Sequence, residues 1–209
     1  EFLIGQETEF MEEHCGKYHV VMMNMKGIGG NSWEKMLDDL WLMLRFVMSN
    51  QADYLDDGDA DIIGINFRDT KAKPDEAIAK RFLLRLTSRL HQKKKKKVIV
   101  LVDEYDAPLN HAFRKGFYDS ASEFFGSFYS NGLKSNVALE RACLMGIVEM
   151  GGTGIISRVN NIVTYPCNEE EFSQYFGFTH QEVSTFLDGD KKRIQEVMEW
   201  YNGYYIGSS

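Results

Sequence analysis

The segment at residues 98–106 constrains what this chain can fold into more than any other part of the sequence. Its first five residues, Val-Ile-Val-Leu-Val, form an unbroken apolar run, and Asp103, Glu104, Tyr105 and Asp106 follow directly. Such a run is typical of a strand buried on both faces in a parallel sheet, where ligands bind outside the carboxyl ends of the strands. Because burying an unpaired carboxylate costs of the order of several kcal/mol, the two adjacent acids indicate a binding site at the strand's tip.

Two further apolar runs predict the strands that complete such a sheet. Residues 18–25 and residues 142–148 are nearly continuous in apolar side chains. Between the runs, apolar residues at helical spacing predict a helix that follows an N-cap at Ser32 and another from Pro74 to about His91. Strands that alternate with helices predict a parallel α/β sheet with helices on both faces.

The remaining stretches are less regular. Residues 50–60 are rich in aspartate and predict a solvated acidic loop, and residues 62–67 predict a short strand. Helical patterns continue after Asp106 to about Lys134, and residues 169–201 predict a tail of short helices.

Charge and composition limit the function classes. The 209 residues carry a net charge of -7, and because phosphate binding needs a basic face, we expect no direct nucleic-acid binding by this chain. The five lysines at residues 93–97 are either a solvated loop that leads into the strand or a nucleic-acid or targeting patch. Cys15, Cys143 and Cys167 lack metal-ligand spacing, and their odd number favours a reducing compartment. With no apolar run near about 20 residues and no signal peptide, we expect a soluble intracellular protein, cytoplasmic or nuclear, with no membrane partner.

The acids at the strand tip suit the Walker-B half of a nucleotide site. There, Asp103 would hold Mg²⁺ through a water, and Glu104 would orient or deprotonate the attacking water. The other half, a G-x-x-x-x-G-K-[ST] loop that grips the phosphates, is absent from the sequence. The glycine-rich residues 27–32 and 151–154 lack the lysine that reaches the phosphates, and we interpret both segments as turns.

Residues 98–110, with the run Asp-Glu-Tyr-Asp-Ala-Pro-Leu-Asn, are also the most recognisable of several blocks spread over nearly the whole chain. The other blocks are residues 3–21, 124–136, 144–147, 157–161, 176–183 and 200–204. In this order the blocks resemble the predicted AAA-ATPase-like family, whose members are P-loop proteins often fused to a C-terminal PD-(D/E)XK nuclease-like domain.

The resemblance implies a P-loop NTPase-like α/β fold of the AAA/ASCE type, a parallel sheet flanked by helices with a small C-terminal helical region. Residues 1–165 would form the α/β core without its first strand and P-loop, and residues 166–209 would form a helical extension. In the family the P-loop lies shortly upstream, so we expect an excised fragment that is inactive alone. In the full-length protein, an ATPase using ATP and Mg²⁺, Asp103 would bind cofactor and metal and Glu104 would be catalytic.

The resemblance also implies that nucleotide state regulates an attached effector, either a protein partner or a fused nuclease-like domain. Arg158 is a candidate cofactor-binding residue that reaches a phosphate, although a solvated or ion-paired arginine fits its setting too. Many relatives have Thr or Ser before Gly146, whereas this chain has Met145, which is no strong donor.

Two alternative functions therefore stay open. One is a non-hydrolysing, NTPase-shaped protein-interaction module, which Met145 favours. The other is a nuclease-associated nucleic-acid-binding module, which the lysine run suggests. A set of aromatic side chains near the end of the chain fits a stacking platform for bases, but we predict that these rings pack together in a small helical core. They are Phe176, Phe178, Trp200, Tyr201, Tyr204 and Tyr205.

Overall fold

A computed structural model of the chain describes residues 3–147, 159, 162–203 and 206–207. It divides into two compact units, residues 1–161 and residues 162–209, and each unit is described by itself. The division at residue 165 that the sequence suggests, taken as a boundary between folding domains, stays a prediction. Among the described helices, none is both long and apolar enough to cross a membrane.

The first unit is built on three parallel strands. They are β1 (His19–Asn24), β2 (Val98–Asp103) and β3 (Leu139–Leu144), in the spatial order β1-β2-β3. The predicted parallel sheet with residues 98–103 as an inner strand is therefore confirmed. Asn24 lies opposite Asp103 in the register, so the carboxyl ends of β1 and β2 meet at one edge of the sheet. The third strand begins three residues before the predicted residue 142, and Val148 lies outside the described residues.

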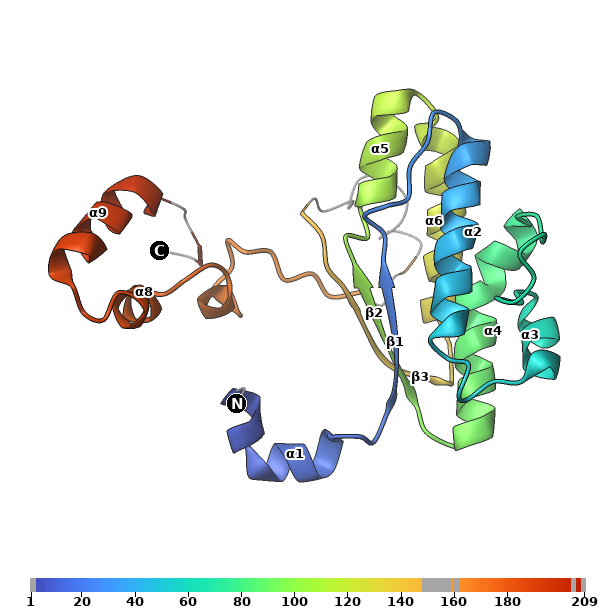
Figure 1. Ribbon diagram of the computed structural model, residues 1–209, viewed down its shortest axis with the longest axis horizontal. Helices are drawn as coiled ribbons and strands as arrows, with labels where there is room; N and C mark the ends of the chain where they lie inside the picture. Colours follow the sequence, from blue (N-terminus) through green and yellow to red (C-terminus); the bar gives the residue numbers. More distant parts are fainter. Residues whose placement is uncertain (1–2, 148–158, 160–161, 204–205, 208–209) are drawn as a thin grey trace. The chain divides into compact units, whose positions relative to one another are not determined.

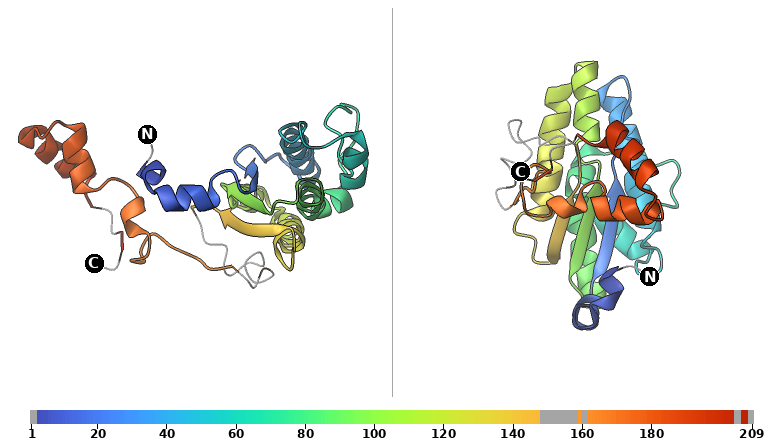
Figure 2. Two further views of the ribbon diagram at one scale, coloured as in Figure 1. Left: turned by 90° about the horizontal axis from the view of Figure 1, so that it is seen from below. Right: turned by 90° about the vertical axis from the view of Figure 1, so that its left-hand side faces the viewer.

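Helices cover one face of this sheet. Figures 1 and 2 show α2 (Trp33–Ser49), α4 (Glu76–Lys94) and α6 (Tyr118–Leu133) on the same side of the strands. On β1, Val21 and Met23 are buried against them, whereas Val20 and Met22 on the other face are 49% and 56% exposed. The prediction of helices on both faces is thus wrong for the described part of this unit. The chain steps from β1 to β2 to β3 in one direction, and right-handed crossovers then carry every connecting helix to the same side.

The core lies between the sheet and these three helices. Most of the largest fully buried side chains come from β1, α2, α4 and α6: Met23, Met36, Leu40, Leu44, Met48, Phe82, Phe124, Phe125, Phe128 and Tyr129. α6 packs tightly against α4 at Gly132, where an added Cβ would lie 2.5 Å from Cδ2 of Leu83. Only a residue without a side chain fits at this contact between α4 and α6.

Residues 50–67 differ from the prediction, because they contain a short helix, α3 (Asp57–Ile63), instead of a solvated loop and a strand. Asp56 and Asp59 form a capping box at its start, and Gly64 ends it with a positive φ of 89°. Asp59 is fully buried. Aspartates that look solvated in the sequence thus serve as helix caps.

The remaining elements of the first unit are short. They are η1 (Leu3–Gln6), α1 (Thr8–His14) and α5 (Ala107–Lys115). Pro74 does not open α4 as predicted. Asp75 is the N-cap instead, with its side chain accepting the Ile78 N–H at 2.9 Å.

The second unit contains η2 (Ser173–Tyr175), α8 (His180–Phe186) and α9 (Lys191–Tyr201). Both α-helices have side-chain N-caps, at Thr179 and Asp190. The predicted aromatic core is wrong for the four predicted rings that the structure describes, because all of them are exposed. They are Phe176, Phe178, Trp200 and Tyr201, whereas Tyr204 and Tyr205 lie outside the described residues.

Candidate functional site

Asp103 is the last residue of β2, the middle strand of the sheet. Its side chain is half-buried and belongs to the sheet face that the helices leave open, together with Ile99 and Leu101. The carboxylate oxygen Oδ2 accepts a hydrogen bond of 2.9 Å from Nδ2 of Asn24, the residue opposite on β1. Apart from that bond, none of the described residues holds this carboxylate.

Glu104 follows at the turn from β2 into α5, with φ of 51°. A non-glycine residue in the left-handed region costs about 1–2 kcal/mol, and such strain tends to persist where surrounding structure enforces it, often at functional sites. The side chain is 34% exposed, and its Oε1 lies 3.7 Å from Nζ of Lys26 in the loop after β1. The sequence therefore places a strained, accessible carboxylate beside the tip of the inner strand.

A buried layer supports this turn. Asp106 is almost fully buried, and its Oδ2 accepts a hydrogen bond of 2.9 Å from Nδ2 of Asn110. Gly146, just past β3, packs so closely that an added Cβ would overlap Asp106 and lie 2.7 Å from the Tyr105 ring. Burial, followed by the nearby Tyr105 and Asp106, raises the pKa of the Tyr129 hydroxyl, so Tyr129 stays neutral beneath the site.

An open cavity of about 470 Å³ lies next to Glu104. The loop at residues 26–30 forms one wall and α5 forms the other. His111 of α5 joins the walls, because its Nε2 donates a hydrogen bond of 2.7 Å to the Gly30 carbonyl. The Gly29 N–H donates to Oδ2 of Asp39 at 3.2 Å. The glycine loop that the sequence predicts as a turn is thus fixed at the edge of the candidate site.

The other predicted site residues fall in two groups. Met145 follows β3, with a 42% exposed side chain, and its backbone pairs with Val102 and Tyr105. Arg158, like the glycines at residues 151–154, lies outside the described residues. Asp103 and Glu104, which are neighbours in the sequence, are therefore the two of these residues that the structure describes at the tip of β2.

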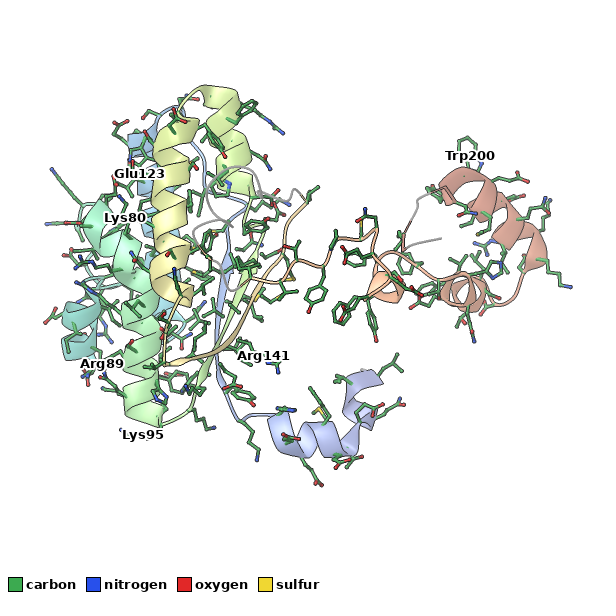
Figure 3. The ribbon with its side chains drawn as sticks, turned by 180° about the vertical axis from the view of Figure 1, so that it is seen from behind. Lys80, Arg89, Lys95, Glu123, Arg141 and Trp200 are labelled. Atoms are coloured by element: carbon green, nitrogen blue, oxygen red, sulfur yellow. The ribbon has the colours of Figure 1, made fainter. Side chains whose placement is uncertain are left out.

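Most of the lysines at residues 93–97 bind locally. Lys93 pairs with the carboxylates of Asp56 and Asp59, Lys96 donates to the Gly16 carbonyl at 2.7 Å, and Lys97 donates to the Val137 carbonyl. Lys94 lies over the Tyr54 ring, 5.0 Å from its centroid. Lys95 is the C-cap of α4, and Figure 3 labels it at that end of the helix. These contacts favour a structural role for the run over a phosphate-binding patch.

A magnesium ion would find little pre-built coordination here. Within the described ranges, no group of three or more His, Cys, Asp or Glu side chains is arranged to hold a metal. The Asp103 carboxylate is still a suitable single ligand, since Mg²⁺ takes oxygen ligands, keeps several waters and relies on substrate phosphates. The residues present fit a metal that arrives with a nucleotide.

Two residues near Asp103 and Glu104 were not predicted from the sequence to lie at the site. Asn24, the last residue of β1, contacts Asp103, and Lys26 in the loop after β1 lies close to Glu104. Asn24 stands out as an amide within the otherwise apolar residues 20–25, and that was the available signal. Its position beside Asp103 depends on the strand register, which a single sequence does not supply.

Comparison with known proteins gives one family. The family described as AAA-ATPase-like, a predicted AAA-ATPase, matches residues 1–156. One relative, from Azotobacter chroococcum mcd 1, is described as an uncharacterized protein in the vnfD 5' region and is 26% identical over 122 residues. That match covers 57% of this chain and 23% of the relative, so the chain spans about a quarter of the relative's length. No solved structure matches the chain.

Proposed function

This chain belongs to the predicted AAA-ATPase family, and from that premise we propose that it carries the acidic half of an ATP·Mg²⁺ site. In the proposal, Asp103 would help to hold the metal and Glu104 would orient or deprotonate the water that attacks the γ-phosphate. Mg²⁺ would supply charge neutralisation on the phosphate oxygens. The phosphate-gripping loop and the first strand would come from residues upstream of this chain.

One observation carries the proposal. Two adjacent acids stand at the carboxyl end of the middle strand of a parallel sheet, where ligands of such folds bind. Asp103 retains a carboxylate oxygen that no described residue engages, and Glu104 borders an open cavity. Glu104 also has a positive φ, a costly backbone conformation that is enriched at functional sites.

The uncovered parts of the sheet support an upstream strand and helix. Among the described residues β3, like β1, is an outer strand of the sheet, and its residues from Glu140 to Cys143 are exposed. If the upstream strand pairs with the free edge of β3, the chain must cross back over the sheet to reach β1. This step runs opposite to the later steps from β1 to β2 and from β2 to β3. A right-handed crossover would then carry the intervening helix to the open face, over Val20 and Met22. The N-terminus of that helix would lie at the strand ends near Asp103, as phosphate binding requires.

The test compares ATP affinity for the 209-residue chain with that of a longer version that includes the upstream residues. We expect tight, Mg²⁺-dependent binding only by the longer protein, because the chain alone lacks the phosphate-binding lysine. Glu104→Gln in the longer protein should keep ATP binding and lose turnover. Comparable tight binding by both versions, or none by either, would contradict the proposal.

We further propose that nucleotide state controls an effector attached to the full-length protein, either a protein partner or a nuclease-like domain. Limited proteolysis of the longer protein with and without ATP and Mg²⁺ tests this idea. We expect the nucleotide to change protection within residues 166–209. Identical digestion patterns in both conditions would argue against nucleotide-dependent regulation.

Met145 favours a second candidate, a non-hydrolysing NTPase-shaped interaction module. The residue follows β3, and its carbonyl accepts the Tyr105 N–H in the turn that carries Glu104. The family resemblance leads us to expect Thr or Ser at this position in many relatives. A thioether is only a weak acceptor and cannot donate to a phosphate oxygen. A longer protein that binds ATP without turnover, and whose behaviour Glu104→Gln leaves unchanged, would favour this candidate over the ATPase.

A further inference from the structure

The carboxyl end of β1 holds the proposed metal ligand of β2. Asn24 and Asp103 are direct cross-strand partners, and their side chains share the open face of the sheet. The amide of Asn24 donates from Nδ2 to Oδ2 of Asp103 at 2.9 Å. A hydrogen bond to an ionised acceptor is among the stronger polar contacts a side chain makes.

The orientation of the Asn24 amide is fixed by a second contact. Its Oδ1 accepts the backbone N–H of Lys26 at 2.9 Å. A flipped amide would put an NH₂ group against that N–H and a carbonyl oxygen against the carboxylate, so both contacts would become repulsive. Asn24 can therefore act toward Asp103 only as a donor.

From this geometry we propose that Asn24 is a positioning residue that holds the Asp103 carboxylate by Oδ2 and leaves Oδ1 for the metal shell. The inference rests on the proposed function, because it concerns the same acidic half-site. A carboxylate held in one rotamer loses less side-chain entropy when it engages a ligand. Groups that orient a metal ligand in this way typically contribute 10- to 100-fold to metal affinity or activity.

Asn66 provides a matched control. Its Oδ1 accepts the Arg68 N–H at 2.9 Å, which is the same local turn that Asn24 makes with Lys26. No described carboxylate accepts a hydrogen bond from the Asn66 amide. Replacing either asparagine by alanine thus removes the same local contact, and only the change at residue 24 also releases Asp103.

The experiment uses the full-length protein with ATP and MgCl₂ as probes. We expect Asn24→Ala to raise the Mg²⁺ concentration for half-maximal ATP binding about tenfold, at the lower end of the range because the pair is exposed. ATP affinity measured in EDTA should stay within twofold of wild type, and Asn66→Ala should match wild type in both assays. If Asn24→Ala does not fold, Asn24→Ser is measured instead, since its shorter side chain cannot reach Asp103 and the same shift is expected.

The outcomes separate this inference from the proposed function. If wild-type protein shows no Mg²⁺-dependent ATP binding, the proposed site is wrong and the role of Asn24 falls with it. If wild type binds as proposed but Asn24→Ala keeps the wild-type Mg²⁺ dependence, only the positioning role is overturned. An equal loss with and without Mg²⁺ would likewise overturn it, because that pattern indicates general damage to the site.

Discussion

The left-handed backbone at Glu104 predicts that glycine is more stable than alanine at this position, the reverse of the usual order. At an ordinary position, alanine is more stable than glycine by about 0.4–1 kcal/mol, because glycine gains more freedom in the unfolded chain. At φ of 51°, alanine pays the left-handed cost of about 1–2 kcal/mol and glycine does not. The pairing with Lys26 cancels from the comparison, because both variants lose it. Glu104→Gly should therefore be more stable than Glu104→Ala by about 0.5–1 kcal/mol.

Urea unfolding followed by tryptophan fluorescence measures this difference on the 209-residue chain. With a slope of about 2 kcal/mol per molar urea, the urea midpoint of the glycine variant should be about 0.3–0.5 M higher than that of the alanine variant. The control pair is Glu123→Ala and Glu123→Gly in α6. Glu123 is exposed in a regular helix, so the alanine variant should be the more stable of the two. Should glycine be the less stable residue at both positions, Glu104 does not occupy a strained conformation, and this argument for a functional strand tip fails.

Three further outcomes follow from packing and charge. Gly132→Ala should lower the free energy of unfolding by about 1–3 kcal/mol, because the added methyl group overlaps Leu83. The control Gly27→Ala meets no atom within 4 Å and should change the free energy of unfolding by less than about 0.5 kcal/mol. Equal urea midpoints for the two variants would refute the close contact of α4 and α6. Burial alone would raise the pKa of Asp59, but hydrogen bonds from Lys93, the Asp56 backbone and Arg89 outweigh burial and lower this pKa to about 2. The stability that the Asp59 carboxylate adds should therefore be complete above pH 4 and be lost as the pH falls toward 2. Lys93→Met should raise the folded-state pKa of Asp59, so that the loss of stability at low pH becomes smaller and is complete at a higher pH, whereas Lys95→Met should leave it unchanged. Unfolding titrations in which the two variants coincide would contradict the assigned pairing.

The sheet and its acidic tip were predictable because they depend on local patterns. An apolar run that ends in acids identifies an inner strand and a candidate site at once, whatever its neighbours are. Asp59 was not predictable in the same way, since its burial depends on Arg89 and Lys93, which lie far along the chain. The open face of the sheet follows from strand order, and apolar residues such as Met22 give no sign of it. The exposed rings of Phe178 and Trp200 illustrate the same limit, because an aromatic side chain reads as core until its neighbours are known.

The edge of β3 that no described strand pairs with has a consequence for handling the chain in solution. An unpaired strand edge offers a row of free backbone donors and acceptors to any other chain, and natural proteins protect such edges with charge, proline or a covering element. Here Glu140 and Arg141 supply the charge, while Ala142 and Cys143 beside them are exposed and uncharged. At high concentration, molecules of the 209-residue chain should associate through this strand edge and precipitate, and Ala142→Lys should reduce the association.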